Sequence, residues 1–484
     1  NYPVFFSPSD PKKLYACSNH LHLSTNEGQS WKTISPDLTT NDKSRQKSSG
    51  GPITQDNTGV EYYCTIFAAC ESPYEPGLLW TGSDDGLVHV SRNGGETWTN
   101  VTPTDLPKWC MVNSVEPDPF RKGGLYLAAT SYKSGDYRPY LFHTSDYGQR
   151  WRKIVNGIDP GHFTRVLRAD PKRQGLLYCG TEEGMYLSFD DGANWQRFQL
   201  NLPLVPITDL AIKNDNLIAA TQGRSFWMID DLTVLHQLSD EIKNKTFHLF
   251  QPMSSYRMGG GQVKNSKTAG TNHPGGVMVH FYLKNKPGET DTVKLDILDA
   301  GGAVLRTFSN QAKEDKLADL KAGGNRFVWN LRLPNAKKFE GLILWSTGLA
   351  GPRVVPGDYR VRLTVNGAVQ EQPFTLLPDP RSAARPEDFQ RQFEFTKACA
   401  DKLSEMHTAI GHIRDLRAQM KNLTERLPAE ARLKPIREQA KLVDSLITQV
   451  EKTLYQTKDR SSQDPLNFPV RLNDKLGNLM ELAA

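Results

Sequence analysis

Apolar and polar residues alternate in short runs through the first half of the chain. These runs are rich in β-branched and aromatic residues, and each leads into a glycine-containing turn. Four of them read KLYACSNHLHLS from Lys13, LLWTGSDDGLVHVS from Leu78, RPYLFHTS from Arg138 and LLYCGTEEGMYLS from Leu176. A period of two with turn residues at both ends is typical of β-hairpins. Residues 1–237 are therefore predicted to form antiparallel β-structure.

The same eight-residue motif, Ser/Thr-x-Asp/Asn-x-Gly-x-x-Trp, closes each of these runs. Its copies are STNEGQSW from Ser24, SRNGGETW from Ser91, TSDYGQRW from Thr144 and SFDDGANW from Ser188. The four tryptophans lie 67, 53 and 44 residues apart, whereas the blades of β-propellers are about 40 to 50 residues long. A fifth unit, NDNLIAATQGRSFWMIDDL, keeps the strands but lacks the motif. The spacing predicts a partial β-propeller of about five blades.

The motif is predicted to be structural, because an active site has no reason to recur four times. Its Asp or Asn accepts hydrogen bonds from its own turn, its Gly supplies a conformation unfavourable to other residues, and its Trp packs under the hairpin. Asn replaces Asp in two copies, which a catalytic carboxylate would not allow. Asp191, beside Asp190, receives no role. The predicted structural positions are Ser24, Asn26, Gly28, Trp31, Ser91, Asn93, Gly95, Trp98, Thr144, Asp146, Gly148, Trp151, Ser188, Asp190, Gly192 and Trp195.

The four motifs resemble the Asp-box, or BNR, repeats of sialidases, xyloglucanase-type double propellers and sortilin-type receptors. More narrowly, SPDLTTND, TGVEYY, GTEEGMYLSFDDGANWQRFQLNLP and TQGRSFWMIDDL resemble the second half of large secreted BNR-repeat proteins common in Bacteroidetes. Those proteins are often labelled glycosyl-hydrolase-like or sortilin-like. The resemblance covers most of residues 1–237 and implies an extracytoplasmic location: secreted, periplasmic, or associated with the outer membrane or cell surface. We also expect further blades upstream in a longer parent protein, or a second chain that completes the ring.

The rest of the chain changes pattern twice. Residues 238–275 are glycine-rich and polar and are predicted to be a linker. Residues 276–380 contain about six short alternating strands, which suggests an Ig-like β-sandwich. Residues 385–484 have apolar positions at spacings of three and four, which predicts a helical hairpin or bundle with a first helix between Pro386 and Pro428. The predicted fold class is therefore mainly β: a partial Asp-box propeller, an Ig-like sandwich and a C-terminal α-helical hairpin.

Composition excludes several classes of function. The net charge is only +5, from 59 basic and 54 acidic residues, too small and dispersed an excess for a nucleic-acid surface. No apolar run is long enough to cross a bilayer. The six cysteines have no Cys-x-x-Cys spacing, and the two neighbouring histidines of the tail, His407 and His412, are not spaced as ligands on one helix face. We therefore expect no metal and no cofactor, and we expect both histidines on the solvated surface.

Chemistry is expected on loops at one mouth of the propeller rather than at the motifs. The candidate catalytic carboxylates are Glu61, Asp85 and Glu183, and the candidate ligand-binding residues are Arg224, Trp227 and Tyr62. Turn or buried roles are favoured for the carboxylates, and Arg224 is expected to pair with a carboxylate. A glycosidase would need two convergent carboxylates, and no spacing in the sequence proves convergence. The arginine triad of a sialidase is not evident.

Two functions follow from these observations. The favoured one is a non-enzymatic binding or scaffold protein with a protein partner or upstream blades, within a larger cell-surface or outer-membrane assembly. The alternative is a glycoside hydrolase or polysaccharide-binding protein, with a glycan in a cleft at the propeller mouth.

Overall fold

The computed structural model describes residues 2–48, 50–56, 62–258, 270–345 and 347–483. The chain divides into two compact units, residues 1–236 and 237–484. Within the described residues, no helix combines the length and the apolar character needed to cross a membrane.

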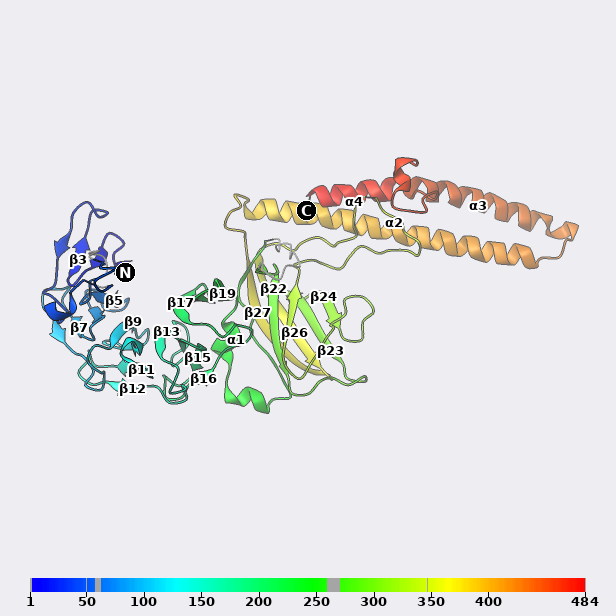
Figure 1. Ribbon diagram of the computed structural model, residues 1–484. Helices are drawn as coiled ribbons and strands as arrows, with labels where there is room; N and C mark the ends of the chain where they lie inside the picture. Colours follow the sequence, from blue (N-terminus) through cyan, green and yellow to red (C-terminus); the bar gives the residue numbers. More distant parts are fainter. Residues whose placement is uncertain (1, 49, 57–61, 259–269, 346, 484) are drawn as a thin grey trace. The chain divides into compact units, whose positions relative to one another are not determined.

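The described residues of the first unit form five antiparallel sheets that follow one another along the chain (Figure 1). In each sheet the strands are neighbours in the order of the sequence, as in the blades of a propeller. We call the sheets blades one to five. Blade one holds β1 (Val4–Phe6), β2 (Leu14–Cys17), β3 (Leu21–Ser24) and β4 (Lys32–Thr33). Blade two holds β5 (Ile66–Glu71), β6 (Leu79–Ser83), β7 (Val88–Ser91) and β8 (Thr99–Asn100). Blade three holds β9 (Met111–Pro117), β10 (Leu125–Ser131), β11 (Asp136–Thr144) and β12 (Arg152–Lys153). Blade four holds β13 (Thr164–Ala169), β14 (Leu177–Thr181), β15 (Gly184–Ser188) and β16 (Gln196–Arg197). Blade five holds β17 (Ile207–Lys213), β18 (Asn216–Thr221) and β19 (Phe226–Ile229), and helix α1 (Thr233–Gln237) follows it.

Neighbouring blades share their apolar cores, which fixes the stacking. Tyr126 and Leu141 of blade three, for example, lie in one cluster with Leu167 and Leu177 of blade four. Small residues in the second strands let the blades approach closely, since a Cβ atom added to Gly82 would lie 2.3 Å from Cγ1 of Val112 in the next blade. The alternation in the sequence therefore supplies apolar side chains for both faces of a sheet: blades two, three and four each pack one face on the blade before and the other on the blade after.

The second unit begins with a sandwich of two sheets. One has the strand order β20-β22-β25 and the other β21-β27-β26-β23-β24. Their facing side chains form one core that includes Val279, Leu295, Trp329 and Val361, each fully buried. The strands are β20 (Phe247–Leu249), β21 (Ser255–Tyr256), β22 (Val277–Leu283), β23 (Val293–Asp299), β24 (Val304–Ser309), β25 (Gly323–Trp329), β26 (Gly357–Val365) and β27 (Ala368–Leu377).

The segment 238–275 differs from the expected linker. It contributes β20 to one sheet and β21 to the other, so part of it belongs to the sandwich. The physical reason is a short apolar run, in which Phe247 and Leu249 point into the core and are buried. Residues 259–269 of the expected linker lie outside the described residues.

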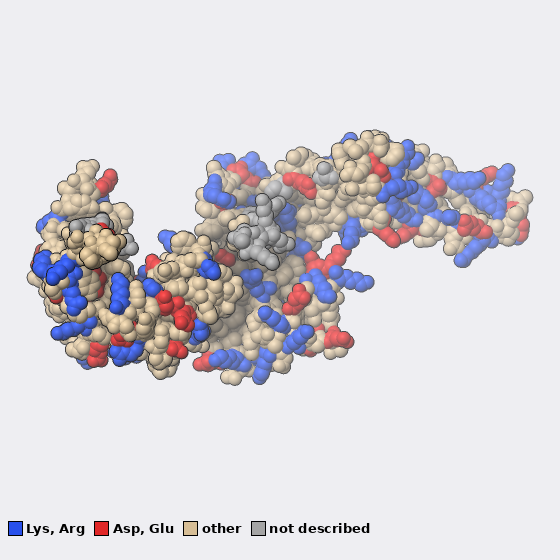
Figure 2. All heavy atoms as spheres, viewed as in Figure 1, with Lys and Arg blue, Asp and Glu red and all other residues tan. Residues whose placement is uncertain are grey.

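Three α-helices follow the sandwich in the part of the chain that the structure describes. Helix α2 (Pro386–Arg426) packs against α3 (Lys434–Leu454) and α4 (Leu472–Ala483). The long helix begins at Pro386, where proline lacks only an N–H that would be unpaired anyway, and ends before Pro428. These elements confirm the predicted fold class, mainly β with a partial propeller, a sandwich and a helical hairpin. Figure 2 shows basic and acidic side chains interspersed along α2 and α3 rather than gathered by sign.

Candidate functional site

The four repeated motifs form four similar turns. The Ser or Thr hydroxyl accepts the backbone N–H of the motif glycine, as in Gly28–Ser24 and Gly192–Ser188, both at 2.9 Å. The Asp or Asn Oδ1 accepts the backbone N–H four residues further on, whether it is the amide of Asn93 (3.0 Å) or the carboxylate of Asp190 (2.8 Å). The amide oxygen of Asn and the carboxylate oxygen of Asp accept the same hydrogen bond, so the turn requires an acceptor oxygen but no charge.

The motif tryptophans bridge the blades. The indole Nε1 donates to a backbone carbonyl of the preceding blade in three copies: Trp98 to Ile34 at 3.0 Å, Trp151 to Val101 at 2.7 Å and Trp195 to Ile154 at 2.7 Å. Each acceptor is the residue directly after the outermost strand of its blade. Trp31 differs, because its indole donates to Gly28 of its own turn at 3.1 Å and the residue is 43% exposed. The motif therefore joins a blade to the one before it.

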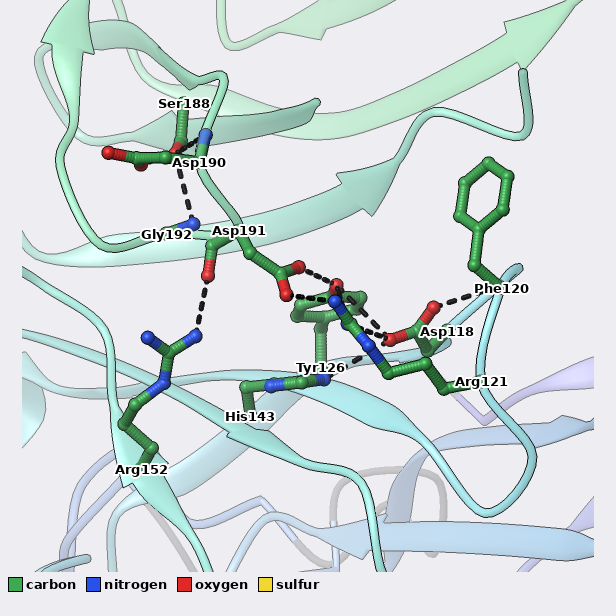
Figure 3. A network of polar contacts seen from close by, with 10 residues as sticks. All are labelled: Asp118, Phe120, Arg121, Tyr126, His143, Arg152, Ser188, Asp190, Asp191 and Gly192. Carbon is green, nitrogen blue, oxygen red and sulfur yellow. Dashed lines mark hydrogen bonds and ion pairs between the residues drawn. The ribbon is translucent and has the colours of Figure 1, made fainter. Parts of the chain in front are cut away.

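Asp191, which the sequence interpretation left without a role, belongs to a polar network between blades three and four (Figure 3). Its carboxylate lies 2.5 Å from the Arg121 guanidinium and accepts a hydrogen bond from the Tyr126 hydroxyl. Arg121 also lies 2.6 Å from Asp118, and His143 Nε2 lies 3.2 Å from the same Asp118 oxygen. Although burial opposes ionisation, hydrogen bonds from His143, Phe120 N–H and Arg121 hold the pKa of Asp118 below its usual value.

This network could also be read as a metal site. Asp118, His143 and Asp191 each place one donor atom within 4.8 Å of the others. The Arg121 guanidinium, however, already bridges the two carboxylates (Figure 3). A divalent cation there would face that fixed positive charge, so the geometry fits an ion-pair link between blades better than a metal site.

The structure places two of the three candidate catalytic carboxylates in corresponding turns of different blades. Asp85 is buried in blade two and accepts hydrogen bonds from Thr40 N at 2.7 Å, Thr40 Oγ1 at 2.6 Å and the Ser83 hydroxyl. Glu183, in blade four, is 60% exposed and lies 3.3 Å from His162 Nε2. The two share no hydrogen-bond partner among the described residues. Glu61 lies outside the described residues.

The three candidate ligand-binding residues are not gathered either. Arg224 is exposed and donates to Gly223 O at 2.9 Å, so the expected ion pair with a carboxylate is not among its described contacts. Trp227 packs against the core shared by blades four and five, and its indole donates to Arg224 O. Tyr62 is 57% exposed and lines a pocket in the other half of the unit.

That pocket, which we call the aromatic pocket, lies between blades two and three. It has a volume of about 370 Å³. It is lined by residues at the starts of β5 and β9, after β6, and at and just beyond the end of β10, the strand ends opposite to those that carry the repeated motifs. The lining residues are Tyr62, Tyr63, Thr65, Phe67, Asp84, Trp109, Met111, Thr130, Ser131, Lys133 and Ser134.

Two stacked aromatic rings form one wall of the aromatic pocket, and a guanidinium group lies against one of them. Tyr63 and Trp109 stack with ring centroids 5.9 Å apart, and the Arg45 guanidinium lies 4.8 Å from the Trp109 ring centroid. Burial and the nearby Asp84 raise the pKa of Tyr63 to about 12, so its hydroxyl stays protonated and donates to Asp84 O at 3.2 Å. Two residues near this wall have left-handed backbone conformations: Trp109 (φ 65°) and Cys64 (φ 68°), which follows Tyr63 in the sequence. Such strained non-glycine residues often mark functional loops.

The one carboxylate among the described lining residues of the aromatic pocket is Asp84. Both of its oxygens accept hydrogen bonds from Thr65, Oδ1 from the backbone N–H at 2.9 Å and Oδ2 from the hydroxyl at 3.3 Å. Burial raises the pKa of Asp84, against these hydrogen bonds. The carboxylate therefore holds the start of β5 in place.

Sequence reasoning missed a second group of charges, which lies on the innermost strands. Arg168 of β13 lies 3.8 Å from Glu116 of β9 and 2.8 Å from Asp209 of β17. Burial raises the pKa of Glu116 to about 7, although Arg168 lowers it. The two acids are about 90 residues apart in the sequence, and only the stacking of three blades brings them to one guanidinium. The available signal was weak: a single Glu at the end of the alternating run MVNSVEP.

No protein-family model matches this chain, and no curated protein matches it. Similar solved structures include the GH74 xyloglucanase from Xanthomonas campestris, at 12% identity and a TM-score of 0.37, covering 76% of this chain and 57% of that one. The GH74 enzyme from Niastella koreensis has 12% identity and a TM-score of 0.35, covering 77% of this chain and 53% of that one. YCF48 from Cyanidioschyzon merolae has 18% identity and a TM-score of 0.27, covering 34% of this chain and 53% of that one.

The chain thus spans about half the length of these solved chains. The propeller assignment rests on the sheet order described above.

Proposed function

We propose that this protein is a binding protein rather than an enzyme, and that a segment of glycan occupies its aromatic pocket. The observation that carries the proposal is the pocket wall, in which Tyr62 is exposed beside the stacked Tyr63 and Trp109. Flat rings flanked by hydroxyl and ammonium groups suit a sugar, because its C–H face packs on aromatic rings while its hydroxyls take hydrogen bonds. Ser131, Lys133 and Ser134 supply such polar groups.

Hydrolysis in this pocket is less well supported. Glycoside hydrolysis takes two carboxylates about 5 to 10 Å apart, and Asp84 stands alone among the described lining residues with both oxygens in use. An extracytoplasmic location and membership of a larger cell-surface assembly belong to the same proposal, supported by the resemblance of the repeated motifs. Protease treatment of intact cells of the source organism tests the location, because an exposed protein is degraded while a cytoplasmic marker survives.

The binding proposal is tested with an oligosaccharide array, followed by calorimetry on any glycan that binds. Tyr62→Ala should weaken binding at least tenfold, since it removes the exposed ring of the pocket. Tyr74→Ala is the matched control: Tyr74 is 50% exposed and lies in the turn at the other end of blade two. Equal loss in both variants, or an array on which the native chain binds nothing, would count against the proposal.

A second candidate, a glycoside hydrolase, is favoured by one observation. Glu116, with its pKa raised to about 7, and Asp209, 63% exposed, flank Arg168 on the inner strands. Two carboxylates in such different environments suit the acid and base roles of hydrolysis. Release of reducing ends from a polysaccharide panel, abolished by Glu116→Gln and by Asp209→Asn, would establish this function in place of the first.

A further inference from the structure

The same contact joins blade two to blade one, blade three to blade two and blade four to blade three, so it shows which groups of the preceding blade a motif binds. After its outermost strand, the preceding blade presents an aliphatic residue, Ile34, Val101 or Ile154, whose carbonyl accepts the motif indole. The side chain of that residue packs on the motif glycine. A Cβ atom added to Gly192 would lie 2.8 Å from Ile154 Cδ1, and one added to Gly148 would lie 2.7 Å from Val101 Cβ.

In blade one this contact has no counterpart among the described residues. The Trp31 indole reaches only its own turn, and a Cβ atom added to Gly28 would meet nothing nearer than the Trp31 ring at 3.6 Å. A surface that is buried in blades two to four is therefore open here.

The first strand of blade one is exposed at the corresponding positions. Val4 pairs with Ala16 and Phe6 with Leu14, just as Leu167 pairs with Cys179 and Ala169 with Leu177 in blade four. Leu167 and Ala169 are 0% and 6% exposed, because they pack on blade three. Val4 and Phe6 are 56% and 64% exposed. We define the leading face as Val4, Phe6, Gly28 and Trp31.

We infer that the leading face docks a further four-stranded blade of the same repeat type. The required partner carries an aliphatic residue with a free carbonyl after its outermost strand, and an apolar sheet surface to cover Val4 and Phe6. A second copy of this chain fits poorly, because its last blade has three strands in the described residues, β17 to β19, and so lacks the outermost strand that supplies the carbonyl.

The structure gives the register for a direct test. Ser7 and Asp170 hold corresponding positions, since each donates its N–H to the carbonyl six residues on, Lys13 and Leu176. Six residues precede Ser7 in the sequence, as six residues separate position 163 from Asp170, so a copy of residues 111–163 fused to the start of the chain would present blade three to blade one with its natural spacing. Phe6→Cys, labelled with a maleimide under native conditions, reports whether the face is covered.

In the fusion, labelling of the cysteine at position 6 should slow at least tenfold relative to the unfused chain. A cysteine at the exposed Tyr74 should label equally in both and serves as the control. If the shorter copy fails to fold, a fusion of residues 64–163 presents two blades and is judged by the same ratio. Unchanged labelling of position 6 in a folded fusion would overturn the inference. So would protection of position 6 in the unfused chain at high concentration together with a doubled mass by sedimentation, since the occupant would then be a second copy.

Discussion

The indole Nε1 of Trp195 lies 2.7 Å from the carbonyl oxygen of Ile154, so the last residue of the motif in blade four is bonded to blade three. Trp195 is 5% exposed and belongs to the core that the two blades share. Trp195, predicted to be a structural residue that packs under its own hairpin, therefore also joins two blades.

Trp195→Phe should destabilise the first unit by about 2 kcal/mol, because it leaves a buried carbonyl unpaired and a void between two blades. Trp31→Phe should change stability by less than about 0.5 kcal/mol, since Trp31 is 43% exposed and bonds only within its own turn. Urea unfolding followed by far-ultraviolet circular dichroism measures both. Equal effects of the two substitutions would mean that the bridge contributes nothing.

Replacing the adjacent residues Asp190 and Asp191 by Asn should affect the stability of the first unit differently. Asp190→Asn should be nearly neutral, because Asn26 and Asn93 already close the same turn. Asp191→Asn weakens the ion pair with Arg121, whose side chain is 30% exposed, and should cost about 1 kcal/mol. A double-mutant cycle with Arg121→Met isolates the coupling. Additive effects of Asp191→Asn and Arg121→Met would show that the pair does not link blades three and four.

Glu116 should make the first unit less stable as the pH rises. Burial raises its folded pKa from 4.5 to about 7, so between these values the folded state holds a proton that the unfolded state has lost. The contribution of Glu116 to the free energy of unfolding is therefore fully present below about pH 4.5 and decreases by up to about 3 kcal/mol as the pH rises to about 7. Glu116→Gln mimics the neutral acid and should remove this fall. Unfolding free energies at pH 4.5 and pH 7.5 test it, and an equal drop in both proteins would contradict the assignment.

The sequence predicts the blades well because alternation and a recurring turn motif are local. It could not assign Asp191, whose partner Arg121 is 70 residues away and comes near only when blades three and four stack. The same limit hid Glu116 and Asp209, which meet through Arg168 across three blades.

The candidate site was predicted only in part for a related reason. Tyr62 was predicted as a ligand-binding residue and lines the aromatic pocket. Trp109 lines the same pocket from the start of the next blade, but it lies in the run LPKWCMV, which contains no recognisable motif. The strand that contains Phe247 and Leu249 was not predicted, because it lies in a mostly polar segment and two apolar residues separated by one are too few to establish a period of two.

His407, predicted to lie on the solvated surface, is 1% exposed on α2, and this burial makes a testable contribution to stability. Its Nδ1 lies 2.6 Å from Lys337 O and its ring meets the Phe339 ring edge-on at 5.2 Å. Burial lowers the pKa of His407, against the hydrogen bond to Lys337. Below pH 6.5 the unfolded state therefore gains a proton that the folded state does not take up, and stability falls as the pH falls.

His407→Asn keeps a donor for Lys337 O but does not titrate. Its unfolding free energy should be below that of the native chain at pH 7.5, because it loses packing against Phe339, and this difference should be smaller at pH 5. His412→Asn, at an exposed position one turn further along α2, is the matched control and should follow the native chain at both values. A gap for His407→Asn that stays constant between pH 7.5 and pH 5 would show that the buried imidazole is protonated at no cost, in conflict with its apolar surroundings.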